Sequence, residues 1–357
     1  MVGFLLFGSA VFPAQAAFTS LFIFGDSISS TTGNTVGPAN LYYGLRYSNG
    51  RVWVELLAQF QGLTYNSNNN NSYFGNTSTN VVATINGFNA PSDASNALFI
   101  VWVNNADLFY PALNNGTSMN AWTNAINASL TNHFKAITNL YAKGARSLIM
   151  PNAVDISTIP KFDNSANKTF IHQRCMDYNA AFTNTLNQIR AACTNLVIYT
   201  PDFFTLLTNI LAHPANYGVT NTLFNYGQGN VSIDAVTDPA LSNKALNGPG
   251  TNHIFWDPTD PSAKVHMWMA NTAQQLVSPV QISNIAMDAD DMSNQLVLAN
   301  VPIGQSGMVL CRTNIMSGTW LTNTTFLSTN ATQTVYVPIS GSQQFYRLCF
   351  PYSWVWP

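Results

Sequence analysis

The chain has 357 residues, 46% of them hydrophobic, which is enough for a sizeable core in one large α/β domain with a smaller module beside it. Only 8% of the residues are charged and the formal net charge is −2, so the sequence has no basic patch of the kind that nucleic-acid binding requires. These properties predict a globular protein that does not bind nucleic acid, and the charge-poor, Asn- and Thr-rich composition favours an extracellular setting.

The first residues of the chain resemble a secretory signal peptide. An apolar stretch is followed by Ala14-Gln15-Ala16, a small-x-small pattern that suits signal peptidase. We therefore expect residues 1–17 to be a signal peptide and the protein to be secreted or extracytoplasmic. No other apolar run approaches the ~20 residues of a membrane-spanning helix, so no membrane span is predicted.

Apolar strand-like runs alternate with helical patterns over residues 18–278. Continuous apolar strands separated by helices are typical of a parallel sheet that is buried on both faces, so we predict a three-layer α/β domain. In such a domain the functional residues lie at the carboxyl ends of the strands. In chain order the segments are LFIF at 21–24, VWVELLAQF at 52–60, NALFIVWV at 96–103, a helical stretch at 121–145, SLIMP at 147–151, a helical stretch at 169–193, NLVIYTPD at 195–202 and a last helix that opens near Pro261.

Short β-rich runs separated by Gly, Asn and Ser turns follow Pro279. This pattern predicts a small all-β sandwich over residues 282–357, with the domain boundary near 278–282. The module contains no His and no obvious acid/base pair, so we expect its role to be binding to a surface or a polymer. The Asn-rich run at 65–72 is predicted to be a solvated loop.

The four cysteines fall into two pairs by position. In a secreted protein each pair could form a disulfide, and neither has the spacing of metal ligands. We favour a disulfide between Cys311 and Cys349, because about 27 Å of helix would separate Cys175 from Cys193. No metal site is predicted.

Several motifs follow one another in the order that is found in a known family. The chain resembles the SGNH, or GDSL, hydrolases over residues 18–275. These are secreted serine esterases and lipases, and the resemblance implies that the parallel sheet is flavodoxin-like. The resemblance implies hydrolysis of carboxylic esters, with a small-molecule, lipid or acylated-glycan ester as substrate, and it implies no cofactor. The motifs are FGDSISSTTGN (24–34), YSNGRVWVELLA (47–58), FIVWVNNADL (99–108), KGARSLIMPN (143–152), AAFTNTLNQIRAA (180–192), HPANYGVTN (213–221) and IFWDPTDPSAKVH (254–266).

Serine acyl transfer requires a nucleophile, a base held by a carboxylate, and fixed donors for the oxyanion. The resemblance assigns the nucleophile to Ser27, whose backbone N–H would also be an oxyanion donor. A second backbone donor falls on Gly75, although the Gly-Gly pair of the family reads Gly75-Asn76 here.

The family's third oxyanion donor is an Asn in the pattern Gly-x-Asn-Asp. In WVNNADL that position falls on Ala106, so this donor would be missing in strict register. Asn104 or Asn105 could replace it if the loop shifts by one or two residues, and we place Asn105 in the oxyanion hole. Loss of one such donor typically costs ~2.7–4 kcal/mol of transition-state stabilisation.

The chain departs most seriously from the family at the pattern Trp-Asp-x-x-His-Pro. Here the segment reads Trp256-Asp257-Pro258-Thr259-Asp260-Pro261, so Asp257 keeps the carboxylate position and Asp260 stands where the base belongs. A carboxylate is a weak base for a serine, although crowding against Asp257 and partial burial would raise the pKa of Asp260. His266, and less directly His253, are alternative bases near this segment.

Three functions remain open. The chain is a secreted ester hydrolase with a weak or displaced base, or a degenerate hydrolase fold that binds an ester, acyl or glycan ligand without turnover, or a surface or matrix protein whose C-terminal module makes the contacts.

Overall fold

Four buried apolar runs form a parallel sheet in the order β1-β2-β3-β4. Every residue of β1 and β2 is buried, as expected for strands that are covered on both faces. The structure is a computed structural model and describes residues 18–35, 40–227, 229–288, 292–315, 318–339, 341, 343–350 and 354–357, so the expected signal peptide lies outside the described residues. The strands are β1 (Leu21–Gly25), β2 (Leu98–Trp102), β3 (Ser147–Ile149) and β4 (Val197–Tyr199).

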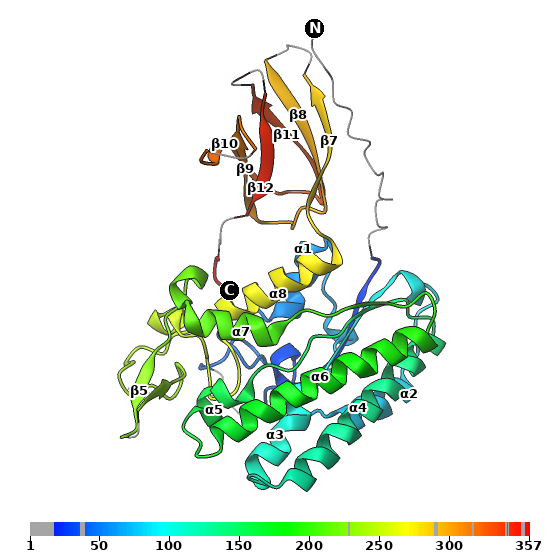
Figure 1. Ribbon diagram of the computed structural model, residues 1–357, viewed down its shortest axis with the longest axis vertical. Helices are drawn as coiled ribbons and strands as arrows, with labels where there is room; N and C mark the ends of the chain where they lie inside the picture. Colours follow the sequence, from blue (N-terminus) through cyan, green and yellow to red (C-terminus); the bar gives the residue numbers. More distant parts are fainter. Residues whose placement is uncertain are drawn as a thin grey trace.

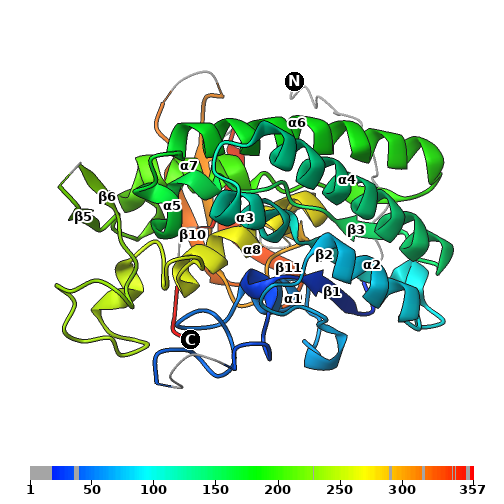
Figure 2. The same cartoon turned by 90° about the horizontal axis from the view of Figure 1, so that it is seen from below.

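Helices cover both faces of this sheet (Figures 1 and 2). Helices α2, α4 and α6 pack side by side on one face, and α1 packs against α8 on the other. The three-layer α/β prediction is therefore confirmed. The helices are α1 (Trp53–Phe60), α2 (Ser78–Gly87), α3 (Asn104–Asn114), α4 (Met119–Ala142), α5 (Pro160–Asp163), α6 (Lys168–Ala192), α7 (Phe203–Ala212) and α8 (Ala263–Val277), and the short 3₁₀ turns are η1 (Ser27–Ser29), η2 (Ser67–Asn69), η3 (Ala94–Asn96), η4 (Ile156–Thr158), η5 (Pro214–Tyr217) and η6 (Pro249–Asn252).

The β-rich C-terminal part forms two three-stranded antiparallel sheets, in the orders β11-β8-β7 and β10-β9-β12. Their facing sides share a small core that includes Leu296, Val309 and Val337, and the module stands at one end of the α/β domain (Figure 1). The strands are β7 (Gln281–Met287), β8 (Ser293–Ala299), β9 (Ser306–Arg312), β10 (Leu321–Leu327), β11 (Thr332–Pro338) and β12 (Phe345–Cys349), and a separate hairpin pairs β5 (Leu223–Asn225) with β6 (Asn230–Ser232).

The predicted disulfide between Cys311 and Cys349 is wrong, because both thiols are free. The register of β9 and β12 places Tyr346 opposite Cys311 and Met308 opposite Cys349. The two cysteines are thus offset by three residues, or about 10 Å along the strands, and their side chains point to opposite faces of the sheet. Cys175 and Cys193 are also free, at positions separated by most of the continuous helix α6.

Among the described residues, no helix is both long enough and apolar enough to cross a membrane. The same residues hold no group of three or more His, Cys, Asp or Glu side chains that could bind a metal ion.

Candidate active site

Ser27 lies in a tight turn at the carboxyl end of β1. The strand ends at Gly25, where an added Cβ would approach the side chains of Ser29 and Ser72 to 2.8 Å, so only glycine fits without rearrangement. The Asp26 carboxylate accepts a hydrogen bond from the backbone N–H of Ile28 at 3.1 Å and caps the short turn η1. Strand, glycine and cap together hold Ser27 at the edge of the sheet.

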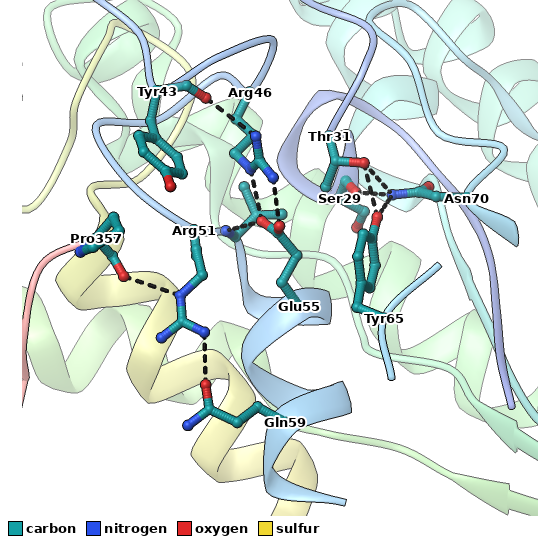
Figure 3. A network of polar contacts seen from close by, with 11 residues as sticks. Ser29, Thr31, Tyr43, Arg46, Arg51, Glu55, Gln59, Tyr65, Asn70 and Pro357 are labelled. Carbon is teal, nitrogen blue, oxygen red and sulfur yellow. Dashed lines mark hydrogen bonds and ion pairs between the residues drawn. The ribbon is translucent and has the colours of Figure 1, made fainter. Parts of the chain in front are cut away.

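The Asn-rich loop braces this turn from outside. The side-chain amide of Asn70 donates to the backbone oxygen of Ser29 at 2.8 Å and to the Tyr65 hydroxyl at 2.9 Å, and Thr31 bonds the same hydroxyl (Figure 3). Asn70 is buried, so the expectation of a fully solvated loop is wrong at this residue. A buried amide needs partners, and the nucleophile turn supplies one of them.

A pocket of about 270 Å³ opens beside Ser27, and Gly75, Asn105 and Thr259 also line it. Its mouth is apolar: Phe74 and Tyr110 are 61% and 67% exposed. Exposed aromatic side chains around a concave site are typical of a binding surface.

Gly75 has a left-handed backbone, with φ of +77°, while an added Cβ would contact nothing within 4 Å. Glycine is therefore favoured here by its conformation and not by lack of space. The neighbouring Asn76 is fully buried, and its side-chain amide donates to the Gly25 oxygen at 2.7 Å. Asn76, which replaces the second glycine of the expected pair, thus ties the Gly75 loop to the end of β1.

Asn105 lines the pocket with an amide group that is held in one orientation. Its Oδ1 accepts the backbone N–H of Val154 at 3.0 Å, which fixes the orientation of the amide group. Its Nδ2 is buried without a hydrogen-bond partner in a residue that lines the pocket of Ser27. Asn104, in contrast, donates to the Pro151 oxygen at 3.1 Å and does not line that pocket. Helix α3 begins at Asn104, and the asparagine that lines the pocket of Ser27 lies one residue before Ala106.

Asp257 and Asp260 form a buried pair of carboxyl groups on either side of Thr259. The Thr259 hydroxyl oxygen lies 3.0 Å from Asp257 Oδ1 and 2.5 Å from Asp260 Oδ2. One hydroxyl hydrogen cannot serve two ionised carboxylates, so the arrangement fits a protonated Asp260 that donates to Thr259, which in turn donates to Asp257.

The electrostatics agree with this assignment. Burial and the charge of Asp257 raise the pKa of Asp260 well above its ordinary value, although hydrogen bonds from Thr259 and Ser27 lower it in part. Burial also raises the pKa of Asp257, against four hydrogen bonds that favour its ionised form. Burial and the neighbouring carboxylate therefore favour the protonated form of Asp260, whose side chain lies within hydrogen-bonding reach of Ser27.

A family model described as GDSL-like lipase/acylhydrolase matches residues 21–273. The chain belongs to this family. No curated protein is similar enough to the chain to match it.

Solved structures of esterases and lipases are similar to this chain at low sequence identity. An acetylxylan esterase from Geobacillus stearothermophilus has 12% identity and a TM-score of 0.39, over 72% of this chain and 94% of that one. A lipase from a goat rumen metagenome has 11% identity and a TM-score of 0.40, over 71% and 95%. An extracellular lipase from Streptomyces rimosus has 12% identity and a TM-score of 0.41, over 71% and 99%.

The histidines of this GDSL family member do not take part in the pocket. His266 is fully buried in α8, where its Nδ1 accepts the backbone N–H of Trp53 at 3.3 Å, and burial lowers its pKa to about 3. His253 is buried too, and its Nε2 lies 3.0 Å from the Asp238 carboxylate. Neither residue lines the pocket of Ser27. The structure therefore leaves His266 apart from the site. The residues that it brings together are Ser27, Gly75, Asn105 and the Asp257–Asp260 turn.

Proposed function

We propose that this GDSL family member hydrolyses carboxylic esters, with Ser27 as nucleophile. The single observation that carries the proposal is the buried, unpartnered Nδ2 of Asn105 in the pocket that Ser27 and Gly75 also line. A donor without a partner is costly in the resting protein and becomes satisfied when an oxyanion forms beside it.

In the proposed reaction, ionised Asp260 accepts the Ser27 hydroxyl proton while Oγ attacks the ester carbonyl carbon. The Ser27 and Gly75 backbone N–H groups and Asn105 Nδ2 receive the oxyanion. When the tetrahedral intermediate collapses, the bond to the alcohol breaks, and the alcohol takes the proton back from Asp260. Water then attacks the acyl-enzyme by the same route. Because Asp260 must first lose its proton and its pKa is raised by burial, the rate rises with pH through that pKa.

The test is hydrolysis of p-nitrophenyl esters by purified protein, with Ser27→Ala as the control that removes the nucleophile. We expect slow, alkaline-favoured turnover that Ser27→Ala abolishes. Asp260→His supplies the missing imidazole and is expected to raise the rate at neutral pH by several orders of magnitude. Turnover that survives Ser27→Ala would refute the proposal.

The buried acid at position 260 favours a second candidate, a protein that binds an ester, acyl or glycan ligand without hydrolysing it. A protonated carboxylic acid cannot accept the Ser27 proton, so below the raised pKa of Asp260 the pocket would hold its ligand intact. Saturable binding of an alkyl ester by wild-type protein, with no product over hours at any pH, would favour this candidate.

We further propose that the protein is secreted, on the basis of the apolar stretch and Ala14-Gln15-Ala16.

For the C-terminal module we propose binding to a surface or polymer. Support comes from its Arg312 and Arg347, whose guanidinium groups lie 4.3 and 4.7 Å from the centroid of the Trp320 ring. Two cations beside one aromatic ring favour an anionic partner.

A further inference from the structure

Residues 41–51, which precede α1, pack against the turn that carries the two carboxyl groups. The Tyr42 hydroxyl donates to Asp257 Oδ2 at 3.1 Å. The Trp256 indole N–H donates to the Leu41 oxygen at 2.7 Å, and the Ser48 hydroxyl donates to the Pro261 oxygen at 3.1 Å. The segment therefore holds this turn at three points, and Tyr42 reaches the carboxylate itself.

The same segment is held from its other side by residues 354–357, which follow the β module. The Trp356 indole N–H donates to the Asn49 oxygen at 2.8 Å, and its ring lies 5.7 Å from that of Tyr43, edge to face. Arg51 Nε donates to the Pro357 oxygen at 3.0 Å, while its Nη1 donates to Gln59 of α1 at 2.6 Å (Figure 3). Residues far apart in sequence thus meet on one short stretch of backbone.

Asn49 joins the two sets of contacts. Its Oδ1 accepts the N–H of Ala263 at the start of α8, and its Nδ2 donates to the Leu246 oxygen at 2.9 Å. Because its backbone oxygen is the acceptor for Trp356, one residue links residues 354–357 to the helix that follows the Asp257–Asp260 turn.

Tyr42 acts on Asp257 among several other charged and titratable groups. Asp260 lies in the same turn, and Tyr47 interacts with both carboxyl groups of the pair. Asp234 interacts with Tyr42 itself, and Asp26 faces Asp260 from the nucleophile turn. Tyr42 brings a hydroxyl donor from outside the turn, and such a donor stabilises the ionised form of Asp257.

We propose that Tyr42 is a positioning residue for the carboxyl pair, and that residues 354–357 keep Tyr42 in place through Asn49 and Tyr43. This inference rests on the proposed function for its catalytic meaning, since the pair serves as base only in an ester hydrolase. The coupling itself is a property of the folded protein and can be measured without turnover.

The test is a ¹³C NMR titration of the Asp carboxyl carbons, with the Asp257 and Asp260 resonances assigned through Asp→Asn variants. Tyr42→Phe keeps the ring and removes the donor, so ionising Asp257 becomes harder while the later ionisation of Asp260 is unaffected. The lower of the two midpoints of the pair should rise by about one pH unit and the upper should stay. Tyr336→Phe, an exposed tyrosine of the β module, is the matched control and should change neither.

Trp356→Phe tests the link to residues 354–357, since it retains an aromatic ring and loses the N–H donor to Asn49. The lower midpoint should rise in the same direction as in Tyr42→Phe, by a smaller amount, while Trp320→Phe in the module should have no effect. An unchanged midpoint in Tyr42→Phe would overturn the positioning role, and an unchanged midpoint in Trp356→Phe alone would overturn the link. A protein that shows both shifts yet hydrolyses no ester would refute the proposed function and leave this inference standing.

Discussion

Asp26 and Ser27 are adjacent in sequence and both line the pocket. Ser27 is partly exposed, whereas Asp26 is only 4% exposed, and burial raises its pKa to about 7. The nearby charge of Asp107 raises this pKa further, against hydrogen bonds from Ile28 and Ala106. The residue that shapes the nucleophile turn therefore changes charge near neutral pH.

This pKa makes the stability of the fold depend on pH. Below the unfolded value of 3.8 both states keep the proton, and between that value and about 7 only the unfolded state releases it. Asp26 therefore lowers the free energy of unfolding by up to about 1.4 kcal/mol for each pH unit in this window. We expect Asp26→Asn, which cannot ionise, to be more stable relative to wild type at about pH 7 than at about pH 4. Urea unfolding of both proteins at the two pH values measures this, and an equal difference at both would contradict it.

Sequence reasoning located Ser27, because a strand followed by Gly-Asp-Ser is a local pattern. It placed Asn105 in the oxyanion hole only by assuming that the loop shifts by one residue. Strict register places Ala106 at the position of the third oxyanion donor. The choice between Asn104 and Asn105 depends on where α3 begins and on the distant Val154. The bracing role of Asn70 was missed for the same reason, since its partner Ser29 is 41 residues away.

At the scale of elements, α1 begins without a capping side chain, because its N-cap residue is Val52. Two other groups satisfy its first N–H donors: Glu55 Oε2 accepts the Val52 N–H at 3.0 Å, and His266 accepts that of Trp53. Arg46 holds Glu55 through two contacts of 2.7 and 2.5 Å (Figure 3). His266, which the sequence offered as a spare base, is therefore part of the packing of α1 on α8.

We expect Glu55→Gln to lower the free energy of unfolding by about 1–3 kcal/mol, because it leaves the largely buried Arg46 without its counter-ion. Thermal unfolding followed by circular dichroism measures the loss. Gln173→Glu, on an exposed stretch of α6, serves as the control and should change stability little. Equal melting temperatures for Glu55→Gln and wild type would show that the pair contributes nothing.

Periodicity predicted the long helices, the parallel strands and most strands of the β module, but it did not predict α2, α3, α5, α7, β10 or the hairpin of β5 and β6. Helices α2 and α7 each lack the combination of a Ser, Thr, Asp or Asn cap with a clear apolar stripe, which is the sequence signal for the start of a helix. Helix α7 does have the Asp202 cap, but its apolar residues are nearly continuous and resemble a strand.

At the scale of the whole molecule, sequence position was a poor guide to cysteine pairing. Cys311 and Cys349 lie on neighbouring strands, yet the register separates them, and register depends on turns that composition does not specify. The protein is thus held together by its two cores and by the contacts of residues 354–357, without covalent links among the described cysteines.

We therefore expect all four cysteines to react as free thiols in protein denatured without reductant. Thiol titration with Ellman's reagent, compared with the same protein after reduction, measures this. Two thiols in the unreduced sample and four after reduction would mean that a disulfide forms and would contradict the separation of Cys311 from Cys349.

The apolar mouth of the pocket has a practical consequence for purification and assay. Phe74, Tyr110 and Leu113 offer an alkyl chain the same surface whether it belongs to an ester or to a surfactant. Detergent carried over from cell lysis would occupy the pocket and compete with an ester for it, so the proposed hydrolysis would be slower in protein prepared with detergent than in the same protein prepared without it.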